Sequence, residues 1–194
     1  MTLKCLPRKA IELRGNAHET LRRHTRHLHD ALDARLVLSN LTSRTGYIDY
    51  LLINWACVPI EHALERAGID QVLPDWERRR RRNALLTDLE ALGVAPPSYA
   101  ALAIDSDVGS LLGWSYVLEG SRLGASVVLQ TVMASSELEI ASTTGFLRHG
   151  DGERLWESFK VELEKINLHP LTITMACIGA TAAFQRFAPL KSSL

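Results

Sequence analysis

The sequence predicts an all-α protein with a single domain. Apolar residues recur at helical spacing along most of the chain, and no segment alternates between apolar and polar residues for long. Only Val127, Val128 and Leu129 have modest strand character. With 194 residues, 46% of them hydrophobic, the chain is long enough for one substantial core and too short for two independent domains. We expect an N-terminal extension over residues 1–15 and a helical domain over residues 16–190.

The first two helices have clear signals at their ends. Asn16 can cap the free backbone N–H groups of a helix that runs to about Leu38, and Glu19 can reach back to this cap. A second helical segment ends at Gly68, and Pro59 is expected to kink or interrupt it. Its apolar positions at helical spacing are Tyr47, Leu51, Leu52, Trp55 and Val58.

Four further helices are expected over residues 75–92, 107–135, 152–167 and 170–187. The first of these stops at Gly93, and the last begins with Pro170, which suits a first helical position. Gly113, Gly120 and Gly124 interrupt the helix of residues 107–135, and each costs roughly 1 kcal/mol relative to alanine in a helix interior. Such a cost indicates a purpose for these glycines.

Composition argues against several classes of function. Lys and Arg together number 22, as do Asp and Glu, so the net charge is zero and no global field favours nucleic acid or an anionic membrane as a partner. Neither a signal peptide nor a membrane-spanning stretch is expected. Cys5, Cys57 and Cys177 form no CxxC pair, which fits a reducing cytoplasm.

Three histidines, His24, His27 and His29, lie in the first expected helix. Among them, His29 lies nearest to the apolar stripe and is the best candidate for an iron ligand, with its second nitrogen held by an acceptor. The alternative is a hydrogen-bonded structural histidine, and His24 and His27 are expected to be solvated. The stripe comprises Leu21, Thr25, Leu28, Leu32 and Leu36.

The glycine-bearing helix has one nearly bare face. Gly113, Val117, Gly120 and Gly124 follow one another at steps of four, three and four residues, which places them near one side of a helix. Glycine lets the backbone approach a flat ligand closely and lets the helix bend, so this face suits a planar macrocycle. Close packing of two helices through small residues is the alternative explanation.

Together, these two helices resemble those of haem oxygenases. Residues Thr25 to Asp33, read as TRHLHDALD, are similar to the proximal-helix pattern, in which Thr precedes the iron-binding His by four residues, and this resemblance implies that His29 is the metal ligand. Residues Tyr116 to Ala125 resemble the distal helix of the bacterial, biliverdin-producing branch, including enzymes associated with phytochromes. The resemblance extends over about residues 17–187 and implies a single-domain haem-oxygenase-like helical bundle, with haem held between the proximal and the glycine-bearing distal helix.

The resemblance also implies the site. Haem is both cofactor and substrate, O2 is the oxidant, and the expected catalytic residues are Gly120, Ser121 and Gly124. The expected haem-binding residues are Thr25, His29, Tyr116, Gly120, Gly124, Ala125 and Lys160. Lys160 is expected to be a propionate partner, and a solvated lysine is the alternative.

Products and partners follow from the same resemblance. They are biliverdin, carbon monoxide and ferrous iron, with electrons from a separate ferredoxin or flavin reductase, because the chain shows no flavin or nicotinamide fingerprint. A phytochrome is a candidate downstream bilin acceptor. Arg78 to Arg82, five consecutive arginines, form either a docking site for an acidic donor, a distant partner of the propionates or a solvated helix face, and at least one stem must pack against protein.

Two positions depart from the animal-type pattern. That pattern has Asp directly after the distal glycine and a Gly-Gly pair later, whereas this chain has Ser121 and then Gly124 with Ala125. Because the Asp organises distal water, its replacement bears on proton delivery and on the site of ring opening. A non-catalytic haem or bilin binder with the same fold therefore stays open as an alternative. Diiron chemistry does not fit, because Glu61 and His62 have the wrong spacing.

Overall fold

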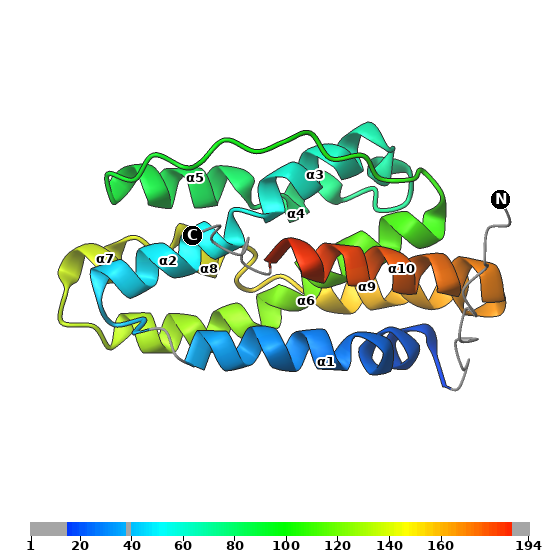
Figure 1. The fold of residues 1–194 in the computed structure, drawn as a ribbon, viewed down its shortest axis with the longest axis horizontal. Coiled ribbons are helices and arrows are strands. Elements are labelled where there is room, and N and C mark those ends of the chain that lie inside the picture. The colour runs from blue at the N-terminus through cyan, green and yellow to red at the C-terminus, as the bar shows by residue number, and fades with distance from the viewer. Residues whose placement is uncertain (1–14, 38–39, 188–194) are drawn as a thin grey trace, which may run out of the picture.

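The computed structural model describes residues 15–37 and 40–187, and every regular element in this part of the chain is helical (Figure 1). This confirms the expected all-α class. Apart from Gly15, the N-terminal extension lies outside the described residues, as do Cys5 and the end of the expected domain after Phe187. The domain boundaries at residues 15 and 190 therefore stay predictions.

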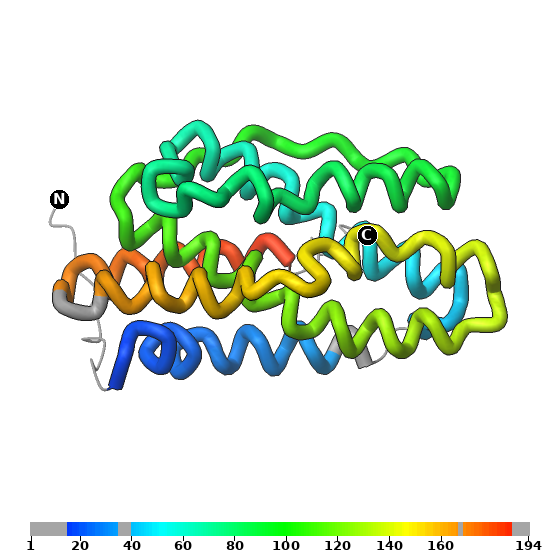
Figure 2. The backbone as a smooth tube through the Cα atoms, turned by 180° about the vertical axis from the view of Figure 1, so that it is seen from behind, coloured from blue at the N-terminus to red at the C-terminus, as the bar shows by residue number. Residues whose placement is uncertain are grey.

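The described helices follow one another in this order: α1 (Ala17–Val37), α2 (Arg44–Asn54), α3 (Cys57–Arg66), η1 (Ile69–Gln71), α4 (Trp76–Arg79), α5 (Arg82–Ala91), α6 (Val108–Met133), α7 (Leu138–Ser142), α8 (Gly145–Arg148), α9 (Leu155–Glu164), η2 (Lys165–Leu168) and α10 (Pro170–Phe187). Both views place α1 along one edge of the bundle and α3 to α5 along the opposite edge (Figures 1 and 2). The helices α9 and α10 lie between these edges, and the segment of residues 94–107 runs over the outer surface of α3 and α5.

Helix α6 packs most extensively against α10, and glycines make this close approach feasible. A Cβ atom on Gly109 would lie 2.3 Å from the carbonyl oxygen of Thr172, and one on Gly113 would lie 2.2 Å from that of Ala176. Both distances are far below van der Waals contact, so no side chain fits at either position. For Gly113, the explanation by close helix packing is therefore the correct one.

Side-chain caps fix the starts of the two long helices that frame the site. At α1, the backbone N–H of Glu19 donates to Asn16 Oδ1 over 2.9 Å, as the sequence predicts. Glu164 of α9 also accepts from the N–H groups of Ala17 and His18, at 2.9 and 3.0 Å. At α6, Asp107 Oδ1 accepts from the N–H of Ser110 over 2.9 Å. The contact to Glu164 joins elements far apart in the chain, which local sequence signals do not reveal.

Two expected helices are divided. The break between α2 and α3 lies at Trp55 and Ala56 rather than at Pro59, which occupies the first turn of α3, where its missing N–H costs no intrahelical bond. The helix expected over residues 75–92 is two helices, because the backbone of Arg80 is extended, with φ −66° and ψ 128°. The modest strand character near Val128 is overridden, since this residue lies inside α6.

Both cysteines in the described part of the chain are buried. Cys57 and Cys177 are free thiols in the core, and burial is the main cause that raises the pKa of both. In the described part of the chain, no helix is sufficiently long and apolar to cross a membrane.

Candidate functional site

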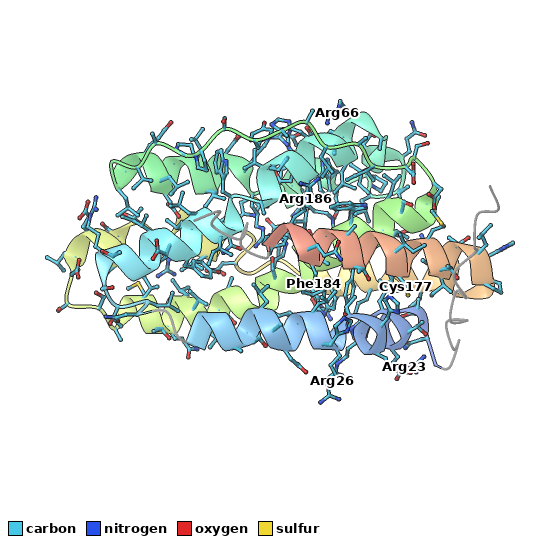
Figure 3. All side chains as sticks on the ribbon, viewed as in Figure 1. Arg23, Arg26, Arg66, Cys177, Phe184 and Arg186 are labelled. Carbon is cyan, nitrogen blue, oxygen red and sulfur yellow. The ribbon has the colours of Figure 1, made fainter. Side chains whose placement is uncertain are left out.

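His29 lies on the exposed side of α1 with one ring nitrogen engaged. Its Nδ1 atom is 3.0 Å from a carboxylate oxygen of Asp33, one helical turn later, and the side chain is 61% exposed. Its ring centroid is 6.3 Å from that of Phe184, which extends from α10 toward α1 (Figure 3). Because Asp33 engages Nδ1, Nε2 is the nitrogen that can bind a metal.

The other two histidines of α1 differ from each other. His27 is exposed, as expected. His24 is half-buried, and burial, followed by the nearby charge of His27, lowers its pKa. The expectation that His24 is solvated is therefore wrong in part, since its position on the helix still brings it against the bundle.

Thr25 and Tyr116 join α1 to α6. The buried hydroxyl of Thr25 donates to the carbonyl oxygen of Leu21 over 2.8 Å, and its side chain lies close to the phenol of Tyr116. Burial raises the pKa of Tyr116, while the interaction with Thr25 and the charge of Arg22 act in the opposite direction. The structure thus brings together two residues that the sequence assigns to haem binding from different helices.

The distal glycines are less covered than Gly113. A Cβ atom on Gly120 would meet only the Trp156 ring, at 3.9 Å, and one on Gly124 would meet nothing within 4 Å. Close packing of helices therefore does not explain Gly124. The neighbouring apolar side chains of Leu123 and Val127 are 55% and 65% exposed. Ala125, which the resemblance assigns to the same surface, is instead buried, with 4% of its area exposed.

Ser121 is hydrogen bonded to a buried cation. Its Oγ atom accepts from Arg81 over 2.5 Å and donates to the carbonyl oxygen of Leu118 over 2.8 Å. Arg81 also donates to that carbonyl over 2.9 Å, and its guanidinium carbon lies 4.8 Å from the centre of the Phe146 ring. A polar pair, hydroxyl and guanidinium, therefore stands at the position where the animal-type pattern has a carboxylate.

Most of the five consecutive arginines are buried or partly buried and have partners within the fold. Arg79 and Arg81 are 2% exposed, while Arg80 and Arg82 are partly buried and both pair with Glu65. Only Arg78 projects into solvent, and it pairs with Glu153 over 2.9 Å. The expected docking site and the solvated helix face are both wrong for most of the run, because the extended residue Arg80 lets the residues on either side of it point inward. The expectation that at least one stem packs against protein is confirmed.

Lys160 is neither fully solvated nor isolated. It is half-buried, and its Nζ atom lies 5.8 Å from the centre of the Trp156 ring. The nearby His18 has its pKa lowered by burial first and then by the charge of Lys160, with a smaller contribution from Arg22. Arg22, which the sequence did not single out, precedes His29 by seven residues and so shares its side of the helix.

The proximal and distal parts of the site are otherwise separate. Helix α1 packs mainly on α10 and α9, and no hydrogen bond or ring contact joins His29 to α6 among the described side chains. Residues 15–37 and 40–187 contain no group of three or more His, Cys, Asp or Glu arranged to hold a metal ion. Glu61 instead accepts from the backbone N–H groups of Arg81 and Arg82, at 2.8 and 3.2 Å, which gives it a structural role.

Comparison with known proteins decides the family. The sequence pattern of the family described as Heme oxygenase matches residues 63–192, about two thirds of the chain. The chain belongs to the haem oxygenase family. Members of this family bind haem as substrate and cofactor. The matched region contains α6 with Gly120, Ser121 and Gly124, and it begins after α1, which carries His29.

Individual relatives agree with this family. The protein named Heme oxygenase PigA from Pseudomonas aeruginosa is 30% identical over 135 residues, which are 68% of each chain. A Heme oxygenase from Xanthomonas campestris pv. campestris is 29% identical over 152 residues, 73% of this chain and 90% of that protein. The NO- and CO-bound haem oxygenase from Neisseria meningitidis shares the fold with a TM-score of 0.68 and 21% identity, over 92% of this chain and 95% of that one. The helical bundle is therefore the haem oxygenase fold.

Proposed function

We propose that this protein is an active haem oxygenase that converts haem to biliverdin, carbon monoxide and ferrous iron. The observation that carries the proposal is the pair of His29 and Asp33. The carboxylate holds Nδ1 and leaves Nε2 of an exposed imidazole for iron, an arrangement typical of histidine ligands in metalloproteins. Membership of the family supplies the expected substrate.

The residues of α6 fit a flat, largely apolar substrate. Gly124 offers bare backbone with open space in front of it, and the exposed side chains of Leu123 and Val127 lie on the same stretch of helix. Exposed apolar area of this kind is costly in water, and covering it with a macrocycle removes that cost. Arg22 near Tyr116 and Lys160 beside Trp156 are cations that suit the two propionates of haem.

The protein's own residues have separate tasks in this proposal. When bound, haem supplies the iron that activates O2 and the ring carbon that is oxidised. His29 would hold the iron, and Asp33 would fix the orientation of the imidazole ring. Gly120 and Gly124 would allow close approach of the distal backbone. The hydroxyl of Ser121 accepts from Arg81 and donates to the Leu118 carbonyl oxygen, and it keeps one acceptor position beside this backbone. Electrons come from an external donor such as a ferredoxin or a flavin reductase.

A haem or bilin carrier is the second candidate, and Ser121 is the observation that favours it. A hydroxyl is a weaker proton donor than the carboxyl group found after the distal glycine in animal-type enzymes. A chain with Ser121 at this position is therefore also consistent with a protein that binds haem or bilin without cleaving haem. The oxygenase and a haem carrier both require haem binding through His29 and differ only in what happens when electrons arrive, whereas a bilin carrier binds no iron.

The deciding experiment is a haemin titration followed by turnover. Wild type, His29→Ala and the control His27→Ala, which changes an exposed histidine of the same helix, are titrated with haemin and then given ascorbate or a ferredoxin system with catalase present. Wild type and the control are expected to bind one haem and form biliverdin, whereas His29→Ala loses binding and turnover. Stable haem under reductant in wild type supports the carrier instead. Absence of haemin binding rejects the oxygenase and the haem carrier.

A further inference from the structure

A buried cluster of charges holds α6 at residues 119–122, next to Gly120 and Gly124. We define the arginine clamp as Arg79, Glu119 and Arg122. Arg79 has five N–H donors on its guanidinium, and all five are used. Two go to the carboxylate of Asp75, both over 2.7 Å, and one goes to Glu119 over 2.8 Å. The remaining two reach α9, at the Leu155 carbonyl oxygen and the Ser158 hydroxyl.

Arg122 completes the clamp one turn further along α6. Its guanidinium donates to Glu119 over 3.1 Å and to the carbonyl oxygens of Arg79 and His149. The side chains of Arg79 and Glu119 are each 1% exposed, and that of Arg122 is 10% exposed. Bonds between charged groups in such a dry setting have strict geometry and are costly to break, so residues 119–122 of α6 are fixed against α4, α9 and the segment after α8.

The place of the clamp along the helix matters. Residues 109–113 of α6 are held by direct backbone contact with α10, through Gly109 and Gly113. The clamp holds residues 119–122, and the bare Gly120 and Gly124 lie within and directly after it. Without the clamp, the two glycines within residues 120–124 would let the helix bend or rotate at this point.

We propose that the arginine clamp positions the distal helix and thereby determines which meso carbon of haem is attacked. Arg79 and Glu119 are positioning residues, since neither faces the bare side of α6. The proposal rests on the proposed haem oxygenase function. A shift of the backbone at Gly120 and Gly124 would change which edge of the haem ring the distal helix leaves uncovered. The isomer composition of the biliverdin therefore reports the position of the helix.

The test compares Arg79→Lys and Arg79→Met with the control Arg78→Met, which removes an exposed arginine of the same helix. Lysine keeps the charge but supplies three donors instead of five and has no planar fork. The first measurement is the isomer composition of the bilin product by chromatography, beside the haemin affinity and the melting temperature of each variant. The second is hydrogen exchange of amides 116–126 in the protein without haem.

Both Arg79 variants are expected to raise the fraction of minor isomers severalfold and to speed exchange of amides 116–126 about tenfold or more, while amides of α10 and the Arg78 control stay unchanged. Should Arg79→Met fail to fold, Arg79→Lys decides. A lower melting temperature with unaltered isomer composition assigns the clamp a merely structural role and overturns the proposal. Loss of bilin in wild type rejects the proposed function itself, and unchanged exchange in the variants then separately rejects the positioning role.

Discussion

Arg81 donates a hydrogen bond to the hydroxyl of Ser121, with the two heavy atoms 2.5 Å apart. The guanidinium is almost fully buried, and of the residues that the structure describes none places a carboxylate within 4.0 Å of it. Its interactions are instead with a hydroxyl, a carbonyl oxygen and the ring of Phe146. The serine is therefore bonded to a buried cation that also interacts electrostatically with Glu61, and this cation stabilises negative charge that develops next to it.

Ser121→Ala is expected to lower turnover without weakening haem binding. The change removes the hydroxyl that Arg81 holds on the distal helix, and loss of one preorganised polar group of this kind lowers the rate of the chemical step by roughly a hundredfold. Single-turnover kinetics with saturating haemin measure it. The control is Ser126→Ala, an exposed serine of the same helix that bonds only to the Leu123 carbonyl oxygen. Equal rates for both variants contradict a distal role for Ser121.

Asp33→Asn is expected to weaken the link between His29 and iron. The carboxylate makes the imidazole more basic and fixes its tautomer, and loss of such a partner costs about ten- to a hundredfold in metal affinity or activity. Haemin affinity and the iron–histidine stretching frequency of the reduced complex both fall in the variant. The matched control is Asp30→Asn, an exposed carboxylate on α1 that lies 3.7 Å from Arg26. If the stretching frequency is unchanged, Asp33 is only a surface residue.

Local sequence signals predict the elements with local causes. The cap at Asn16 and the start of α10 at Pro170 are both where the sequence places them, because caps and first-turn proline depend on residues within a few positions. The break at Arg80 was not predicted, since nothing in a run of charged helix formers marks it. The break is explained by tertiary contacts on either side of it. Arg79 donates a hydrogen bond to Glu119 on α6, and the backbone N–H of Arg81 donates to Glu61 on α3.

The site shows the same division. A resemblance in two short segments predicts His29 and the distal glycines as site residues. The structure separates the glycines by their packing, since Gly113 packs against α10 and Gly124 does not. Periodicity cannot make this distinction, because it places all these residues on one face. Burial of Ala125 and the cation beside Ser121 also depend on segments distant in the chain.

Acid is expected to destabilise the fold in part through His149. Burial, and then the charges of Arg122 and Arg81, lower its pKa below the ordinary 6.5. The unfolded chain therefore binds a proton at a higher pH than the folded protein, and the free energy of unfolding falls as the pH drops below about 6.5. His149→Gln keeps an acceptor for Arg122. In urea titrations between pH 5 and 7.5, this variant is expected to lose the part of the slope of the free energy of unfolding against pH that corresponds to binding of about one proton. The pKa values of His18 and His24 are also lowered, so wild type is the necessary reference and an identical slope in both proteins contradicts the assignment.

Gly113→Ala and Gly124→Ala are expected to act in opposite directions on stability. At Gly113 the new Cβ lies 2.2 Å from the Ala176 carbonyl oxygen, so α6 and α10 must separate, and the free energy of unfolding falls by about 1–3 kcal/mol. At Gly124 the new Cβ meets nothing, and the better helix propensity of alanine raises the free energy of unfolding by up to about 1 kcal/mol. Urea unfolding without haem measures both changes. In haemin titrations, Gly124→Ala is expected to bind haemin more weakly than wild type, although it is the more stable protein. The added methyl group occupies space that the bare backbone offers to the substrate. Unchanged affinity in Gly124→Ala shows that this glycine does not approach haem, and the bare face then has to be sought at Gly120 alone.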